Sequence, residues 1–214
     1  MQANYVQRLR LTFRKDGPTR FIGHLDLART LERSLNRARI PMSYSQGFNQ
    51  RPRMNLAAAL PLGYTSECEM ADIWLQEAMD PATAQAQMMA KMAPGIEIWR
   101  VEEIPLSEPA LQTRIVAARY AITLLDPIAP DELERRIAAL LAADSLPRER
   151  RDKSYDLRPL LLDLAPAPPD GDLPRLTMRL ALREGQTGRP DEVLAALDLD
   201  PLAARIHRAE IELR

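Results

Sequence analysis

Cysteine and histidine are scarce in this chain of 214 residues, which has one cysteine and two histidines. The single cysteine, Cys68, cannot form an internal disulfide, and it cannot supply the several thiolates that an iron–sulfur cluster needs. A structural zinc site takes about four Cys or His ligands, and Cys68, His24 and His207 are the whole supply. The sequence therefore predicts neither a metal site nor a cofactor.

Long apolar runs and glycine-rich phosphate loops are also missing. The chain has no run of about 18 apolar residues and no N-terminal apolar segment of the signal-peptide kind, so we expect a cytoplasmic protein with no membrane partner. Neither GxxxxGK[ST] nor GxGxxG occurs, and nucleotide sites of those two types are not predicted. The composition, with 46% hydrophobic and 28% charged residues, is that of a globular protein.

Positive charge is concentrated at the start of the chain, although the formal net charge is only −1. Residues 1–60 carry 11 Lys and Arg against 3 Asp and Glu, whereas residues 61–112 carry 2 against 9. An arginine excess of this size can attract a polyanion. The acidic segment can equally neutralise it inside the folded protein, and the sequence leaves both interpretations open.

Hydrophobic periodicity predicts the same order of strands and helices in each half of the chain. In the first half, we expect strands at residues 8–14, 42–45, 67–75 and 96–104, and helices that begin at His24 and at Asp80-Pro81. In the second half, we expect strands at residues 115–125, 176–183 and 204–213, helices that begin at Pro130 and near Pro190, and a segment at residues 155–164 that leads into a proline-rich loop at residues 165–172. The order β-α-β-β-α-β is that of a ferredoxin-like domain. We therefore predict an α+β fold of two tandem ferredoxin-like units with antiparallel sheets, at residues 1–108 and 109–214.

The densest positive charge lies between residues 20 and 63. The predicted helix carries three arginines opposite an apolar stripe formed by Leu25, Ala28, Leu31, Leu35 and Ala38. In the loop that follows, Gly47 and Pro52 restrict the backbone between two further arginines. We expect this segment to bind RNA, with Arg29, Arg33, Arg37, Arg51 and Arg53 on phosphates and Tyr44 and Phe48 stacking on bases. The alternative is a solvated helix face on which Asp26 pairs locally with Arg29.

Two further groups of residues are candidates for chemistry. His24, at the predicted helix start, is either a general acid or base for metal-free RNA cleavage or a structural residue bonded to the backbone. Helical geometry places Asp26 on another side of the helix, so we do not expect the two side chains to pair. A second cluster, Lys153, Asp156 and Arg158, is either a binding site or an internal Asp156–Arg158 pair.

The segment FIGHLDLARTLERSLNRARIPMSYSQGFNQRPRMNLAAALPLGYTSECE, residues 21–69, resembles the opening signature of the radical SAM-linked family of bacterial proteins. KSYDLRP at residues 153–159 and GRP at residues 188–190 are similar to the second-half motifs of that family. One departure is Gln50, where the resemblance leads us to expect proline or histidine. Family members occur alone or as the C-terminal part of cobalamin-binding radical SAM proteins, which implies a partner enzyme of that kind. The resemblance implies no established activity.

We therefore expect a non-catalytic accessory protein that binds RNA and presents it to a cobalamin-dependent radical SAM enzyme. The chain cannot itself be the radical enzyme, because such a cluster needs three cysteines. Two alternatives stay open. One is an adaptor that docks its positive segment on the radical SAM enzyme without contacting RNA, and the other is a metal-independent RNA-processing enzyme that uses His24.

Overall fold

The computed structural model describes residues 4–46, 48–150, 152–183 and 185–214, except for the side chain of Lys153. The chain forms two compact units, Met1–Arg114 (unit 1) and Ile115–Arg214 (unit 2). Each unit combines helices with antiparallel strands, so the predicted α+β class is confirmed. None of the helices in the described ranges is long and apolar enough to cross a membrane.

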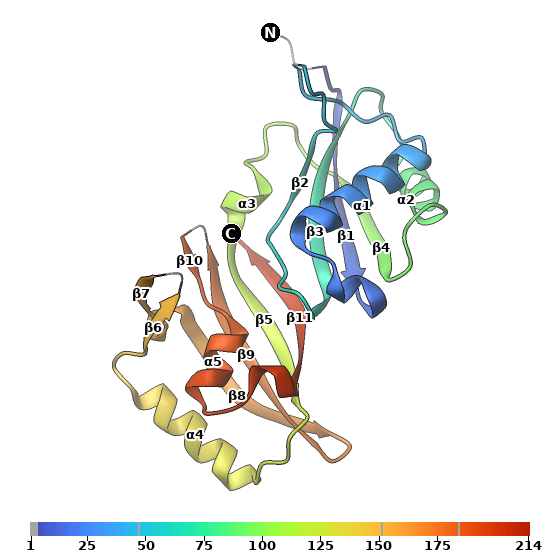
Figure 1. The fold of residues 1–214 in the computed structure, drawn as a ribbon. Coiled ribbons are helices and arrows are strands. Elements are labelled where there is room, and N and C mark those ends of the chain that lie inside the picture. The colour runs from blue at the N-terminus through green and yellow to red at the C-terminus, as the bar shows by residue number, and fades with distance from the viewer. Residues whose placement is uncertain (1–3, 47, 151, 184) are drawn as a thin grey trace. The chain divides into compact units, whose positions relative to one another are not determined.

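Unit 1 follows the predicted order of strands and helices (Figure 1). Its elements are β1 (Gln7–Lys15), a 3-10 helix (Gly17–Phe21), α1 (His24–Arg37), β2 (Met54–Leu56), β3 (Thr65–Leu75), α2 (Pro81–Met89), β4 (Ile96–Glu103) and the single turn α3 (Leu111–Arg114). β1 pairs antiparallel with both β3 and β4, and β2 pairs antiparallel with β3. The strand order is therefore β4-β1-β3-β2.

The strand predicted at residues 42–45 is wrong. Met42 and Tyr44 make only isolated bridges, to Leu75 and Pro52, and the short strand of this region is β2, which follows the basic loop. Because Pro52 has no backbone N–H, it cannot continue a ladder opposite Tyr44. The alternation of residues 42–45 does not reveal this limit, since it depends on Pro52, which lies on the other side of the loop.

The core of unit 1 lies between the sheet and the two longer helices. Leu9 and Leu11 of β1 belong to one buried cluster with Leu31 of α1 and Met88 of α2, so α1 and α2 cover the same face of the sheet (Figure 1). The predicted helix stripe needs one correction, because Leu25 is 70% exposed. The buried positions are Leu27, Leu31, Ser34, Leu35 and Ala38, and Leu25 lies about 160° around the helix from Leu27.

Unit 2 repeats this arrangement with an inserted hairpin. Its elements are β5 (Ile115–Leu124), α4 (Pro130–Ala142), β6 (Pro147–Arg150), β7 (Lys153–Asp156), a 3-10 helix (Arg158–Leu160), β8 (Leu161–Asp170), β9 (Leu173–Arg183), β10 (Gln186–Thr187), α5 (Pro190–Ala196), a 3-10 helix (Pro201–Ala203) and β11 (Ala204–Leu213). β5 pairs antiparallel with β9 and β11, β9 also pairs with β8 and β10, and β6 pairs with β7. The long strands therefore follow the order β11-β5-β9-β8, which matches that of unit 1.

The proline-rich segment predicted as a loop is instead the second half of β8. Pro166 lies opposite Leu176, and Ala167 lies opposite Arg175, in the ladder between β8 and β9. β9 is the partner found for β8 within the described residues, so one edge of β8 needs no backbone N–H donors. Proline is tolerated at such an edge, which explains why the composition of a loop is compatible with a strand here.

Candidate nucleic-acid site

Two arginines of the predicted basic loop line a pocket of about 390 Å³ in unit 1. We call it the arginine pocket, and its lining includes Tyr5, Arg8, Ser45, Arg51, Arg53, Asn55, Trp74, Leu106 and Glu108. Along β1 and β3, Arg8 and Trp74 alternate with Leu9 and Ile73. Since Leu9 and Ile73 pack in the helix-covered core, the pocket lies on the face of the sheet opposite α1 and α2.

A buried ion cluster underlies this face. Arg8 donates from Nη2 and Nε to Oδ2 of Asp72 at 2.5 and 3.2 Å, and Arg10 donates from Nε to Oδ1 at 2.8 Å and from Nη2 to Oδ2 at 3.0 Å. Asp72 is fully buried, and both arginines are at most 5% exposed. One carboxylate therefore serves two guanidinium groups, which leaves the cluster with an excess of positive charge.

Arg8 also fixes the wall of the pocket. Its guanidinium donates to the carbonyl oxygens of Glu108 and Pro109 at 2.5 and 3.1 Å, and its Cζ lies 4.8 Å from the centroid of the Trp74 ring. The carboxylate of Glu108 pairs with Arg114. The carboxylate of Glu108, which lines the pocket, and that of Asp72, which pairs with Arg8, are thus already held by arginines of unit 1.

The loop arginines are held by backbone contacts, and neither guanidinium group pairs with a carboxylate among the described residues. Ser45 N donates to Arg51 O at 2.8 Å, Arg51 N donates to Ser45 Oγ at 3.0 Å, and Arg53 N donates to Ser43 O at 2.7 Å. The Arg53 guanidinium carbon lies 5.5 Å from the Tyr5 ring centroid. Its Nε is buried and has no hydrogen-bond partner among the described residues. The expectation about Gly47 falls outside the described residues.

The aromatic residues near the site differ from those predicted. Tyr5 and Trp74 meet edge to face in the pocket, with ring centroids 6.4 Å apart. Tyr44 packs against the core, and its hydroxyl donates to Asn36 Oδ1 at 3.0 Å. Phe48 is fully exposed on the loop and does not line the pocket.

The arginines of α1 are not brought to the pocket. Arg29 pairs with Asp26 at 3.3 Å, with both side chains more than 60% exposed, which is the local pairing considered from the sequence. Arg33 is exposed, and Arg37 lines a separate hollow beside Arg39 and Lys91. Because α1 packs on the opposite face of the sheet, the predicted set of five arginines divides into a helix group and a loop group.

His24 is the first residue of α1, and it lies apart from the pocket lining. Its Nδ1 is buried and has no hydrogen-bond partner within the described part of the chain. The Asp26 carboxylate contacts Arg29. The predicted separation of His24 from Asp26 is consistent with that contact, whereas a backbone bond at Nδ1 is not found.

The second predicted cluster is tied into the local structure of unit 2. Oδ1 of Asp156 accepts from the backbone N–H groups of Leu146 and Arg158, at 2.7 and 2.9 Å, and these bonds lower the pKa of the carboxyl below its usual 3.8. The Arg158 guanidinium donates to the carbonyl oxygens of Leu141, Ala143 and Leu161. It thereby satisfies free carbonyls at the end of α4. Lys153 begins β7, and its side chain is outside the described part of the structure.

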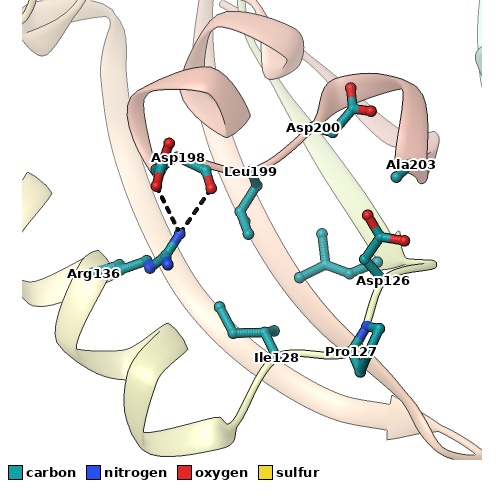
Figure 2. Close-up of a pocket in the computed structure, with 9 residues that line it drawn as sticks. Asp126, Pro127, Ile128, Arg136, Asp198, Leu199, Asp200 and Ala203 are labelled. Atoms are coloured by element: carbon teal, nitrogen blue, oxygen red, sulfur yellow. Dashed lines mark hydrogen bonds and ion pairs between the residues drawn. The ribbon is translucent and has the colours of Figure 1, made fainter.

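A smaller hollow of about 230 Å³ lies in unit 2 (Figure 2). Figure 2 shows the Arg136 side chain reaching from α4 to Asp198. Its Nη1 donates to the carbonyl oxygens of Leu197 and Asp198 at 2.9 and 2.7 Å, which satisfies carbonyls just after α5. Asp200 accepts from Leu202 N at the start of a 3-10 helix. These side chains serve the fold, and no group of three or more His, Cys, Asp or Glu within the described ranges is placed to hold a metal ion.

Three residues that line the pocket were not predicted from the sequence: Tyr5, Arg8 and Trp74. Arg8 and Trp74 fall within the strands predicted at residues 8–14 and 67–75, and neither of them is given a binding role by the sequence. A signal was present, because the polar faces of the two strands carry complementary charges, and Arg10 lies directly opposite Asp72 in the β1–β3 ladder. An antiparallel pairing of these two predicted strands places Arg10 beside Asp72.

Comparison with known families accounts for most of the chain. The chain belongs to the family DUF2344. This family, described as an uncharacterized protein conserved in bacteria, matches residues 8–190. The match includes all of the arginine pocket except Tyr5. No curated protein matches this DUF2344 chain.

Several solved structures resemble this DUF2344 protein in fold. A Cbf5-Nop10-Gar1 complex contains a chain that is 8% identical, with a TM-score of 0.50, and the alignment covers 98% of this chain and 50% of that chain. An H/ACA RNP bound to a substrate RNA gives a TM-score of 0.47, with 8% identity and coverage of 98% and 48%. An archaeal box H/ACA sRNP Nop10-Cbf5 complex gives 0.48, with 8% identity and coverage of 97% and 49%. The chain spans about half the length of these chains, and at such identity the likeness concerns the fold alone.

Proposed function

We propose that this protein is a non-catalytic accessory that binds single-stranded RNA through the arginine pocket of unit 1. The observation that carries the proposal is that Arg51 and Arg53, which have no carboxylate partner in the described part of the chain, line one pocket with the rings of Tyr5 and Trp74. Arginine forks bind phosphate oxygens, and aromatic rings stack on unpaired bases. Both kinds of contact are available on one side of the sheet.

The strand pairing within each unit supports a ferredoxin-like assignment for both units. In unit 1 the order β4-β1-β3-β2 is antiparallel throughout, and in unit 2 the order β11-β5-β9-β8 has the same form. Each order is that of a β-α-β-β-α-β unit whose second strand lies at one edge and whose fourth lies at the other. Since unrelated functions share this fold, we infer RNA binding from the side chains of the pocket.

The partner we propose is a cobalamin-dependent radical SAM enzyme. The proposal rests on the resemblance of residues 21–69, 153–159 and 188–190 to the radical SAM-linked family. With one cysteine in these 214 residues, the cluster for radical chemistry must be supplied from outside them. In this proposal the arginine pocket binds RNA, and the partner enzyme carries out the reaction.

A second candidate is an adaptor that docks on the partner enzyme without contacting RNA. It is favoured by Phe48, a fully exposed aromatic side chain in the same loop as Arg51. Aromatic and arginine side chains are both enriched at protein interfaces. This candidate predicts that Phe48→Ala abolishes binding to the partner enzyme while the wild-type protein shows no affinity for RNA.

Catalysis by His24 has less support, because His24 lies outside the arginine pocket and Asp26 pairs with Arg29. If His24 were catalytic, His24→Ala would abolish RNA turnover and leave RNA binding intact. Unchanged turnover in that variant would exclude it.

The experiment that tests RNA binding compares two double variants with equal loss of charge. Arg51→Ala/Arg53→Ala removes the loop arginines, and Arg29→Ala/Arg33→Ala removes two arginines from the opposite face of the sheet. Using fluorescence anisotropy of a short unstructured RNA at low salt, we expect the loop variant to bind at least about tenfold more weakly, because each charged hydrogen bond contributes roughly 1.5–3 kcal/mol. The helix variant should bind like wild type. Equal weakening in both variants, or no binding by wild type, contradicts the proposal.

A further inference from the structure

We propose that the arginine pocket holds one unstacked nucleotide of the RNA, with its base against Tyr5 and Trp74 and its phosphate on Arg51 and Arg53. The inference rests on the proposed RNA-binding function and goes beyond it, because binding to a charged surface would need no pocket and no rings. Four observations support it.

The first observation is that aromatic rings and guanidinium planes alternate along the wall of the pocket. Arg8 lies over Trp74, Trp74 meets Tyr5 at an interplanar angle of 64°, and Arg53 lies over Tyr5. Nucleobases stack on both kinds of surface, and such stacking tolerates different sequences because every base has a π-face. A phosphate alone would need only the arginines, so the rings indicate a base.

The second observation is the size of the pocket. Its volume of about 390 Å³ is in the range of sites that enclose a small molecule. A double helix keeps its bases stacked and paired inside, so it cannot place one against these rings. The ligand must therefore come from an unpaired stretch or a loop.

The third observation is that the lining has polar groups without partners. Nε of Arg53 is a buried donor with no acceptor among the described residues, so no carboxylate of the described chain neutralises this guanidinium group through Nε. The side-chain amide of Asn55, which lines the pocket, makes no hydrogen bond to any other described residue. An amide offers a donor and an acceptor together, which suits the edge of a base.

The fourth observation is the absence of competition for the arginines. Asp72 is engaged by Arg8 and Arg10, and the Glu108 carboxylate is engaged by Arg114. Neither acid is free to pair with Arg51 or Arg53. The bonds to Ser43 and Ser45 fix the backbone of both arginines, and the Arg53 guanidinium group also lies over the Tyr5 ring, so part of the ordering cost of binding is already met.

The test uses the fluorescence of Trp74 in the full-length protein. The chain has two tryptophans, and Trp99→Phe leaves Trp74 as the sole reporter. The probes are adenosine and uridine 5′-monophosphate, the corresponding nucleosides, ribose 5-phosphate, a short single-stranded RNA, and the same RNA as a duplex. RNA binding is followed separately by anisotropy.

We expect the mononucleotides and the single-stranded RNA to quench Trp74 to saturation and to compete with each other. Ribose 5-phosphate should bind about tenfold or more weakly, since stacking of one base contributes roughly that much or more. The duplex should not quench. RNA that binds by anisotropy without quenching Trp74, and without competition from mononucleotides, overturns the pocket inference and leaves RNA binding intact. Mononucleotide binding without RNA binding overturns the proposed function and, with it, the assignment of the ligand to an RNA strand.

A pair of variants provides a check that is independent of tryptophan. Asn55→Ala should weaken mononucleotide binding by about threefold to tenfold, the effect of one lost hydrogen bond. Asn49→Ala, at an exposed position outside the pocket lining, should have no effect. Equal affinities of the two variants would exclude Asn55 as a contact of the base and overturn the proposed orientation of the nucleotide.

Discussion

At the scale of single residues, Asp72 is a carboxylate whose charge depends entirely on its protein partners. It is fully buried and accepts hydrogen bonds from two buried arginines. A buried charge that loses its partner keeps its desolvation cost, so breaking such a pair costs far more than removing a surface pair. Loss of the Asp72 carboxylate would also affect the arginine pocket, because Arg8 pairs with Asp72 and lines the pocket.

We predict that Asp72→Asn lowers the free energy of unfolding by about 3–5 kcal/mol, because two buried guanidinium groups lose their countercharge. Urea unfolding followed by circular dichroism measures this. The control is Glu97→Gln, which removes an exposed partner of Arg14 and should change stability by less than about 1 kcal/mol. Similar stabilities of the two variants would mean that the Asp72 cluster is not required for the fold.

At the scale of elements, the two second-half motifs meet in unit 2. Gly188 packs against the residue that directly follows KSYDLRP, since a Cβ at Gly188 would lie 2.9 Å from Leu160 O and 3.1 Å from Leu180 Cβ. Gly188 N also donates to Ala181 O. The two motifs therefore have a structural reason to occur together, which is the close approach of two backbone segments.

We predict that Gly188→Ala destabilises the protein by about 1–3 kcal/mol, because the added methyl group cannot fit without a shift of backbone. Thermal unfolding compares it with Gly23→Ala, a position where a Cβ would meet nothing within 4 Å. The Gly23 variant should lose only the smaller contribution of the N-cap of α1, about 0.5–1 kcal/mol. A Gly188 variant as stable as the Gly23 variant would show that the contact with Leu160 relaxes freely.

An ion network joins three strands of unit 2 and should make stability depend on pH. Arg179 on β9 donates to both carboxylate oxygens of Glu212 on β11, at 2.6–3.1 Å, and Arg119 on the intervening β5 lies 3.3 Å from Glu212. The hydrogen bonds from Arg179 lower the pKa of Glu212 below its usual 4.5. A depressed carboxyl pKa stabilises the fold above the unfolded value, and that contribution is lost as the pH falls through the folded value.

We predict that Glu212→Gln costs about 1 kcal/mol near neutral pH, a value reduced by the partial exposure of Arg179. The difference from wild type should shrink as the pH falls below 4.5 and vanish once Glu212 is protonated in the folded state. Denaturant unfolding at a series of pH values measures both quantities. A difference that persists unchanged in acid would contradict the assignment to the carboxylate.

At the scale of the whole molecule, the charge asymmetry resolves into two parts. The acidic segment pairs with the strand arginines, through Asp72 for Arg8 and Arg10 and through Glu97 for Arg14. It leaves the loop arginines without a carboxylate partner among the described residues. A protein with a net charge of −1 has little overall attraction for RNA, so affinity must come from local contacts.

We predict that the salt dependence of RNA binding reports these contacts. For single strands, the slope of log K against log salt is roughly −0.7 for each phosphate neutralised, so Arg51→Ala/Arg53→Ala should reduce its magnitude by about 1.4. Arg29→Ala/Arg33→Ala should leave it unchanged. Binding titrations at several salt concentrations measure the slopes. The same reduction in both variants would indicate diffuse attraction to the whole surface.

The sequence by itself determined most elements of the fold and the general location of the positive surface. Alternation identified β1, β3, β4, β5, β9 and β11, and Asp80 caps α2 as its position predicted, accepting from Thr83 N at 2.8 Å. These features are local, because a strand face, a helix stripe or a cap depends on neighbouring residues alone. The position of Arg51 and Arg53 in a loop after the helix was predictable for the same reason.

Only the tertiary structure decided which charges remain available. Arg8 and Arg10 look as exposed in the sequence as Arg51 and Arg53 do, and their burial depends on Asp72, which is more than 60 residues away. The edge position of β8, the separation of Arg29 from Arg51 by a sheet, and the arrival of Tyr5 and Trp74 beside the loop all arise from strand pairing. Pairing is set by contacts distant in sequence, and periodicity within a single segment carries no information about them.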